Sequence, residues 1–384
     1  MRSLEIGTIR NSLGLAVVFL AMIQWATSSG VLQTLHDQDA SDDLRLNEIQ
    51  LIGTHNSYHL APQPKLLAMI GTAGKSVAEA IDYSHAPLEK QLSELGVRQL
   101  ELDLYADPEG GLYRDPVGKK LLGADARDSR MDFDFDREMI TPGIKIIHAP
   151  GFDYATTVPT LKLALEQIIA WSHEHPGHLP IFVLLELKES VVGPAGVKPI
   201  AFDEDRLDAL DEEIRNVVPA SMLVTPDHVR GDKESLRDAI AGIGWPQLDA
   251  LCGKIIFALD NTDGVRERYL QGHETLQGRI LFVSVDESHP AAAWMKINDP
   301  VADFERIRRC VQQGFLVRTR ADADTIQARS GDTSRRDRAF ESGAQFISTD
   351  YPAPDPRWPE YQVRWPDNAI YRLNPIRTTP LKSQ

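Results

Sequence analysis

The sequence predicts an α/β protein: a single-domain (β/α)8 barrel of the TIM type with an irregular C-terminal tail. Three observations predict this fold class. Short β-rich apolar runs recur along the 384-residue chain, amphipathic helix patterns lie between several of them, and eight such runs fall between residues 48 and 350. Alternation of strand and helix favours parallel strands, and eight parallel strands favour a closed barrel over an open sheet.

The eight expected strands can be read in order along the chain. They are residues 48–54, 97–105, 144–149, 180–188, 254–260, 279–285, 314–320 and 344–350. Segments such as "TVPTLKLALEQIIAWSHE" and "VADFERIRRCVQQG" place apolar residues three or four apart, which is the pattern of helices that cover a sheet. Two regions are weaker: the stretch between Val191 and Trp245 is longer than one helix needs, and the helix between the fifth and sixth strands is poorly marked.

The chain divides into four expected parts. Arg2 and Arg10 precede an apolar run from Leu13 to Ile23, and small and polar residues follow it, which is the layout of a secretory signal peptide. We therefore expect a secreted or periplasmic protein, with an uncleaved N-terminal membrane anchor as the alternative. The expected parts are a signal peptide (1–28), a polar segment (29–45), the barrel (46–352) and a Pro-rich tail packed on the barrel (353–384).

Composition excludes some partners. The formal net charge is -15, and no basic arm or run interrupts the acidic surface, so we expect no nucleic-acid partner. No feature of the sequence indicates an obligate protein partner. The chain has two cysteines, Cys252 and Cys310, and their spacing does not decide whether they pair.

Polar residues gather at the ends of four expected strands. In "IQLIGTHNSYHLAP" (49–62), an apolar strand closes at Gly53 and runs directly into a His-Asn pair. Barrel enzymes keep their active sites at the C-terminal ends of the strands. The residues at these ends are His55 and Asn56 on the first strand, Glu101 and Asp103 on the second, His148 on the third and Glu186 on the fourth.

The acids among these residues predict a metal site. Glu101 and Asp103 are two apart in a strand and therefore point to the same face, towards the barrel interior. With Glu186 nearby, three carboxylates would repel one another unless a cation lay between them. Carboxylates and the amide oxygen of Asn56 are hard oxygen ligands, which suit Ca²⁺ first and Mg²⁺ second.

The two histidines predict acid-base chemistry beside that metal. An imidazole titrates near neutral pH and can give or take a proton within one turnover. His55 and His148 would thus serve a metal-bound phosphodiester, one activating the nucleophile and the other protonating the leaving oxygen.

Other motifs favour structural interpretations. "PKLLAMIGTAG" (64–74) is expected to be a helix that caps the barrel, with contact to a bilayer as the alternative. "MDFDFDRE" (131–138) is expected to be a solvated acidic hairpin, because it lacks the glycine and final glutamate of a calcium loop. "HEHPGH" (173–178) falls between a helix end and a strand start, at the non-catalytic end, and His59 is not on the helix that a zinc pair with His55 would need.

Four blocks of the sequence resemble a known family, the calcium-dependent phosphatidylinositol-specific phospholipases C, particularly the secreted bacterial type. "GTHNSYH" looks like that family's first-strand motif and "VRQLELDLYADPEGGLY" like its second-strand block. "IIHAPGFDYATTVPTL" resembles the third block and "HPGHLPIFVLLELKE" the fourth. The specific likeness covers about residues 46 to 190, and the rest of the barrel more loosely.

The resemblance implies roles for individual residues. It makes His55 and His148 catalytic and places Asn56, Glu101, Asp103 and Glu186 on calcium. In that family the inositol 2-hydroxyl attacks its own phosphate, which releases diacylglycerol and a cyclic inositol phosphate. Which histidine is the acid and which the base stays open, as does the final form of the product.

The substrate expected from the resemblance is a phospholipid at a membrane surface. "KIIFALDN" ends in Asp260 and Asn261, where eukaryotic members place lysines for extra ring phosphates, which argues against a polyphosphorylated head group. Lys188, Arg318 and Arg320 are the candidates for contact with phosphate or inositol, although an arginine on a strand can equally extend along the helix side.

Two rival functions remain open at this point. A glycerophosphodiester phosphodiesterase is another metal-using barrel with paired acids and two histidines, and "ISTDYP" (347–352) would fit it. A secreted binding barrel that has lost turnover is the rival outside enzymology.

Overall fold

The computed structural model describes residues 44–192 and 197–377. The expected signal peptide and nearly all of the expected polar segment lie outside these residues. Among the described helices, none has the length and apolar character that crossing a bilayer requires.

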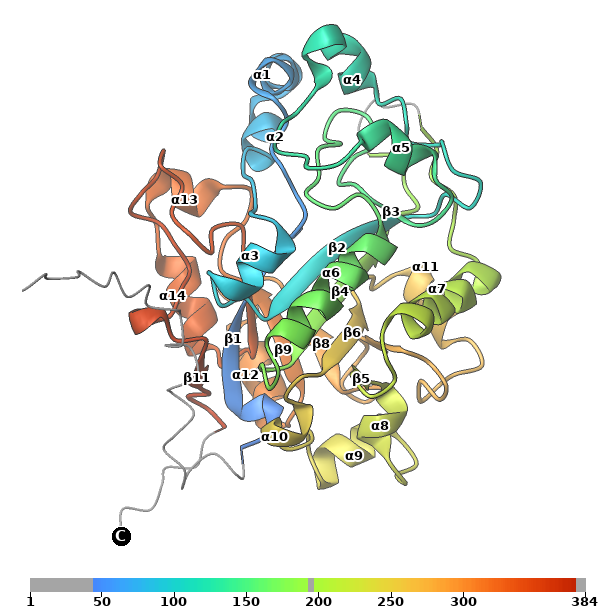
Figure 1. Cartoon of the computed structure of the whole chain (residues 1–384). Coiled ribbons are helices and arrows are strands. Elements are labelled where there is room, and N and C mark those ends of the chain that lie inside the picture. The colour runs from blue at the N-terminus through green and yellow to red at the C-terminus, as the bar shows by residue number, and fades with distance from the viewer. Residues whose placement is uncertain (1–43, 193–196, 378–384) are drawn as a thin grey trace, which may run out of the picture. The chain divides into compact units, whose positions relative to one another are not determined.

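The expected (β/α)8 barrel is confirmed. Within the described residues, eight parallel strands form a ring in which β1 lies between β2 and β10. Figure 1 shows β1 and β2 among these strands, with helix α6 (Leu161–Glu174) in front of them. Going round from β1, the members are β1 (Ile49–Thr54), β2 (Gln99–Tyr105), β4 (Ile181–Leu187), β6 (Ile255–Leu259), β7 (Leu281–Val283), β8 (Trp294–Lys296), β9 (Leu316–Arg320) and β10 (Phe346–Thr349). The ring closes between β7 and β8 through a single parallel bridge, Ser284 to Trp294.

The third expected strand is not a member of the ring. Only Lys145–Ile146 (β3) is extended, and it pairs antiparallel with the end of β2. As a result β4 is the direct neighbour of β2, and the prediction that His148 ends a barrel strand is wrong. The eighth member is β8, which the sequence did not predict because three residues carry too little alternation to be recognised.

Two further strands also escaped prediction. β5 (Leu223–Val224) pairs with the first half of β6, within the long region after β4. β11 (Tyr371–Leu373) lies in the tail and pairs antiparallel with β1. The rest of the tail is largely irregular, and its Tyr361, Val363 and Trp365 are buried against the barrel together with Ile52 and Ile347.

Helices cover the outside of the ring, where the outward-facing leucines of β2 and β4 need apolar partners. The bounds are α3 (Leu88–Ser93), α6 (Leu161–Glu174), α7 (Glu204–Val217), α8 (Pro226–Arg230), α9 (Leu236–Gly242), α10 (Leu248–Leu251), α11 (Gly264–Leu270), α12 (Phe304–Gln312), α13 (Ile326–Ser330) and α14 (Ser334–Glu341). The 3₁₀ turns are η2 (Leu46–Glu48), η3 (Gly123–Ala126), which continues α4 (Val117–Leu122), and η4 (Pro366–Asn368). Helix α6 is typical: Thr160 caps its N-terminus, and Leu161, Leu165 and Ile168 bury one face in the core.

A cap of short helices lies at the end of the barrel where β1 and β2 finish, at the top of Figure 1. It comprises α1 (Pro64–Ala73), α2 (Lys75–Ala80), α4 (Val117–Leu122) and α5 (Phe135–Ile140). Leu66 of α1 is 1% exposed and packs with Tyr105 and Tyr154 in a separate apolar cluster, whereas Met69 is 38% exposed. Residues 64–73 therefore do form the expected helix over the barrel end.

Candidate active site

The first strand delivers His55 and Asn56 into a fixed position. The backbone N–H of His55 donates to the carbonyl of Thr349 at 3.1 Å, so the residue after β1 is still tied to the strand beside it. Asn56 then turns the chain with a φ of 46°, a left-handed conformation that asparagine tolerates better than most residues. Gly53 is needed just before this turn, because a Cβ there would lie 2.1 Å from Oε1 of Gln99.

His55 lies among charged groups from three strands. Its Nδ1 atom is 2.8 Å from Oδ1 of Asp350, and its Nε2 atom is 3.3 Å from a guanidinium nitrogen of Arg320 and 3.8 Å from Oε1 of Glu101. Burial lowers the pKa of His55 well below its ordinary value, and the charges of Arg320 and Arg318 lower it further. The hydrogen bond at Nδ1 leaves Nε2 facing the site.

His148 lies on the loop that follows β3. Its Nδ1 atom is 2.6 Å from Oδ2 of Asp153, and the hydroxyl of Tyr105 donates to its backbone carbonyl at 3.0 Å. Burial lowers the pKa of His148, but the adjacent Asp153 carboxylate outweighs this effect and the net shift is upward. The side chain is 25% exposed, so the ring borders the open side of the site.

Three carboxylates converge at the barrel mouth from three adjacent strands. Oxygen atoms of Glu101, Glu186 and Asp260 all lie within 4.8 Å of one another. Glu101 belongs to β2 and Glu186 to β4, and Asp260 directly follows β6. Burial raises the pKa of Glu101 to about 8, with Arg318 opposing the shift, and burial together with Asp103 also raises that of Glu186.

Cationic side chains already accompany these acids. Lys188 lies with its Nζ 3.0 Å from Asp103 and 2.9 Å from Glu186. Arg318 forms an ion pair with Glu101, and Lys296 forms one with Asp260. Four acids thus face three cations, which leaves the mouth with one formal negative charge in excess.

The residues fit a divalent cation that prefers oxygen ligands. Two buried oxygen atoms at the site, the amide oxygen of Asn56 and one carboxylate oxygen of Asp260, accept no hydrogen bond from the described residues. A buried acceptor without a donor costs free energy, and a bound cation removes that cost. The donor set consists of carboxylate and amide oxygens, as calcium sites have.

The structure brings most of the sequence-predicted residues to one end of the barrel. His55, Glu101, Asp103, Glu186 and Lys188 are connected through the contacts given above. Asn56 joins them through Tyr83, since its amide donates to the Tyr83 hydroxyl at 3.2 Å and that hydroxyl lies 3.4 Å from Nδ1 of His55.

The two predicted arginines differ in their positions. Arg318 is 1% exposed and points into the barrel, where it is paired with Glu101 and donates to Asn298. Arg320 contacts both Asp350 and His55 and is the arginine nearer to the imidazole. Neither extends along the helix side.

Sequence reasoning missed several residues of the site: Tyr83, Asp153, Asp260, Lys296 and Asp350. Asp260 and Asp350 each directly follow a barrel strand, the same signal that pointed to His55. Asp153 lies five residues after His148, in a loop that folds back on itself, and no pattern in the sequence predicts that fold.

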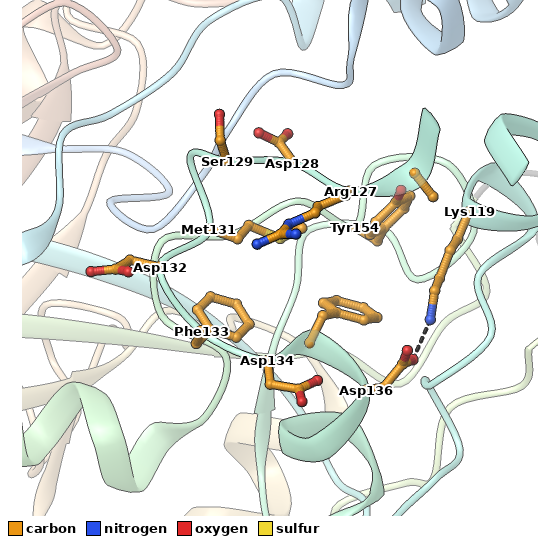
Figure 2. A pocket seen from close by; sticks show the side chains of 12 residues that line it. Lys119, Arg127, Asp128, Ser129, Met131, Asp132, Phe133, Asp134, Asp136 and Tyr154 are labelled. Carbon is orange, nitrogen blue, oxygen red and sulfur yellow. Dashed lines mark hydrogen bonds and ion pairs between the residues drawn. The ribbon is translucent and has the colours of Figure 1, made fainter. Parts of the chain in front are cut away.

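A cavity of about 710 Å³ lies apart from these residues (Figure 2). It is lined mainly by the segment between β2 and β3, including Arg127, Phe133 and Phe135, and by Tyr154. The expected acidic hairpin is wrong here: residues 135–140 form α5, and Asp134 caps that helix by accepting from the N–H of Arg137. Those acids serve helix capping and the ion pair of Asp136 with Lys119.

The histidines of "HEHPGH" have structural contacts at the opposite end of the barrel. His175 stacks on Trp171 with ring centroids 4.3 Å apart, and His178 shares a hydrogen bond of 2.6 Å with Ser172. Among the described residues, the metal-competent groups of three or more do not include them.

Comparisons with known proteins identify a family and related solved structures. The model of the family described as "Phosphoinositide phospholipase C, Ca2+-dependent" matches residues 44–375. No curated protein matches the sequence directly.

Solved structures share the fold. A calcium-dependent phosphoinositol-specific phospholipase C from Pseudomonas sp. is 16% identical with a TM-score of 0.52, and the alignment covers 87% of this chain and 97% of that one. A Ca²⁺-dependent phosphatidylinositol-specific phospholipase C from Streptomyces antibioticus is 14% identical with a TM-score of 0.50, covering 80% and 95% of the two chains.

Proposed function

Because the chain belongs to the calcium-dependent phosphoinositide phospholipase C family, we propose that it cleaves phosphatidylinositol, or a close relative, to diacylglycerol and an inositol phosphate. One observation carries the proposal. His55 and His148 each direct Nδ1 at a buried aspartate, and the same barrel end holds the converging carboxylates Glu101, Glu186 and Asp260.

Calcium is the cofactor of this family, and the donor set described above fits it. Glu101, Glu186 and Asp260 would hold the ion, with Asn56 and Asp103 as the neighbouring oxygen donors. When bound, the ion neutralises charge that builds up on the phosphate during cleavage.

His55 is suited to the role of general base. Asp350 accepts a hydrogen bond from the N–H at Nδ1, which leaves the lone pair of Nε2 as the acceptor for the proton of the attacking hydroxyl. Arg320, 3.3 Å from that nitrogen, is placed to bind a phosphate oxygen close to the attacking group.

His148 is suited to the role of general acid. The Asp153 carboxylate favours the protonated ring, so the imidazole holds a proton that it can donate to the departing oxygen of diacylglycerol. The two rings exchange roles when water later opens a cyclic product, because the reverse proton transfers are then required.

We infer that the enzyme acts outside the cytoplasm on a lipid surface. The N-terminal leader pattern supports export. Met69 and Val77 on the cap helices are 38% and 58% exposed, and Leu121 of α4 is 44% exposed, so apolar side chains are available for contact with lipid at this end.

A single assay tests the function. The mature protein is incubated with phosphatidylinositol vesicles, with and without a calcium chelator, and water-soluble inositol phosphates are measured. We expect release that the chelator abolishes and added calcium restores. Release of glycerol 3-phosphate from glycerophosphodiesters with phosphatidylinositol untouched would instead identify a glycerophosphodiester phosphodiesterase, and calcium binding without any hydrolysis would identify a binding barrel.

A further inference from the structure

We propose that Asp153 and His59 are positioning residues for His148: Asp153 fixes the tautomer and orientation of the imidazole, and His59 holds Asp153 in place. This inference rests on the proposed function, because it assigns a task to the two residues only if His148 transfers a proton.

The three side chains form one hydrogen-bonded chain. Oδ2 of Asp153 is 2.6 Å from Nδ1 of His148. Nε2 of His59 lies 2.9 Å and 3.0 Å from the two carboxylate oxygens of Asp153. The carboxylate therefore accepts hydrogen bonds from both imidazole rings, and rotating it would break at least one of these bonds.

The burial of His59 determines which of its nitrogens donates. The side chain is 0% exposed, and its Nδ1 atom has no hydrogen-bond partner within the described part of the chain. An unpartnered N–H in the interior costs more than an unpartnered lone pair, so Nδ1 is the unprotonated nitrogen and Nε2 carries the hydrogen. His59 then donates from Nε2 to Asp153, and the Asp153 carboxylate orients His148.

The backbone brings Asp153 back to His148 through a closed loop. The N–H of Ala149 donates to the carbonyl of Asp153 at 2.9 Å, and the N–H of Asp153 donates to the carbonyl of Ala149 at 3.2 Å. Burial raises the pKa of the Asp153 carboxyl, but the two histidines outweigh burial and lower it to about 2, so the group is charged at neutral pH.

His59 also connects the loops of the two catalytic histidines. The N–H of Thr157 donates to the carbonyl of Tyr58 at 2.7 Å, and the N–H of Leu60 donates to that of Ala155 at 3.3 Å, so the segment after β1 is paired with the segment after His148. Tyr83 packs on the His59 ring with centroids 4.5 Å apart. The hydroxyl of Tyr83 reaches His55, and one connected unit therefore holds both imidazoles.

The same three side chains are close enough to be considered for a metal, since one ligand atom from each lies within 4.8 Å of the others. The distances favour hydrogen bonds, because 2.6 to 3.0 Å between nitrogen and oxygen is the length of an N–H···O hydrogen bond. Zinc binding at this cluster is the competing outcome of the test.

The test compares turnover of phosphatidylinositol by the variants Asp153→Asn, His59→Leu and His59→Gln with that by the wild type. Asp153→Asn is expected to lower kcat by roughly 10²-fold with KM unchanged. The amide has one oxygen acceptor in place of two, so it cannot accept hydrogen bonds from the ring nitrogens of His59 and His148 in the same way. His59→Leu is expected to lower kcat by about 10-fold, and His59→Gln, which restores a donor, is expected to recover most of that loss.

A double-mutant cycle shows whether these residues act through His148. Because His148→Ala removes the group being positioned, adding Asp153→Asn to it should cause no further loss of kcat. Additive losses, a change in KM alone, or normal turnover by Asp153→Asn would each overturn the positioning role. His178→Gln, which alters a buried histidine at the other end of the barrel, controls for general destabilisation, and thermal unfolding is measured for every variant.

A spectroscopic readout separates positioning from folding. The hydrogen-bonded Nδ1 proton of His148 should give a downfield resonance that disappears in His148→Ala and in Asp153→Asn. Persistence of that resonance in Asp153→Asn overturns the inference, as does tight Zn²⁺ binding that His59→Leu and Asp153→Asn both abolish. Full activity of His148→Ala would instead overturn the proposed function itself.

Discussion

His55 and Asp350 face each other because the parallel register of their strands puts them side by side. Thr54 at the end of β1 pairs with Thr349 at the end of β10, so the next residue on each strand emerges at the same point of the barrel mouth. Asp350 is buried, and its Oδ1 atom lies 2.8 Å from Nδ1 of His55. The carboxylate thereby selects the ring tautomer that presents Nε2 to the substrate side.

The Asp350→Asn variant tests this arrangement. The amide can donate to Nδ1 and would favour the opposite tautomer, which removes the free lone pair on Nε2. We expect kcat to fall by at least about 10²-fold while KM changes little, as for other acid-base residues whose ring partner is altered. Steady-state kinetics on phosphatidylinositol vesicles measure this, and a variant with unaltered kcat would show that Asp350 does not control the ring.

Replacement of either imidazole that we propose to transfer a proton should have a similar effect. We expect His55→Ala and His148→Ala each to lower turnover on the order of 10²-fold or more, because each removes a proton-transfer group. Far-ultraviolet circular dichroism should show an intact fold in both. His178→Ala is the matched control, since it removes a buried imidazole whose partners are Ser172 and the backbone carbonyl of Leu179, and its activity should stay at the wild-type level. Near-normal turnover by His55→Ala or by His148→Ala would contradict the role proposed for that histidine.

Asp260 provides a test of the metal site that is independent of turnover. The Asp260→Asn variant weakens an oxygen donor in the converging group with Glu101 and Glu186, so we expect calcium affinity to fall by about 10-fold or more. Isothermal titration calorimetry measures the affinity directly. Asp132→Asn serves as the control, because Asp132 is an exposed acid beside the separate cavity and should leave calcium affinity unchanged. Equal calcium affinities in the two variants would show that Asp260 does not bind the ion.

The sequence predicted the parts of the site that depend on strand periodicity. Glu101 and Asp103 share a face because they are two apart in β2, and Glu186 joins them because β4 runs parallel to β2 with Asp103 opposite Glu186. The same logic applies to Asp260 after β6. It was interpreted only as the absence of a lysine, although the predicted order of the strands already placed residues 254–260 beside residues 180–188, as the pairing of β4 with β6 confirms.

The parts that the sequence did not predict depend on loops and on very short strands. β8 has three residues and is recognised through its pairing with β9 and its bridge to Ser284. The pairing of Asp153 with His148 and His59 arises from a loop closed by Ala149, and no periodicity marks such a closure. Residue types at strand ends can therefore be read from sequence, whereas contacts that orient them require the folded chain.

The Asp153 and His148 pair also predicts a pH dependence of stability. The pKa of Asp153 is lowered from 3.8 to about 2, so in the native state this carboxyl binds fewer protons than in the unfolded chain. It therefore contributes stability above its unfolded pKa, on the order of 2 kcal/mol, and this is lost as the pH falls from about 4 to about 2. His148, whose pKa is raised, contributes stability below its unfolded pKa that is lost as the pH rises through its folded pKa.

Urea unfolding of wild type and Asp153→Asn across this range should show the largest difference in free energy of unfolding near pH 5 and a smaller one at pH 2. A difference that does not change between these two pH values would show that the charge of Asp153 does not stabilise the fold.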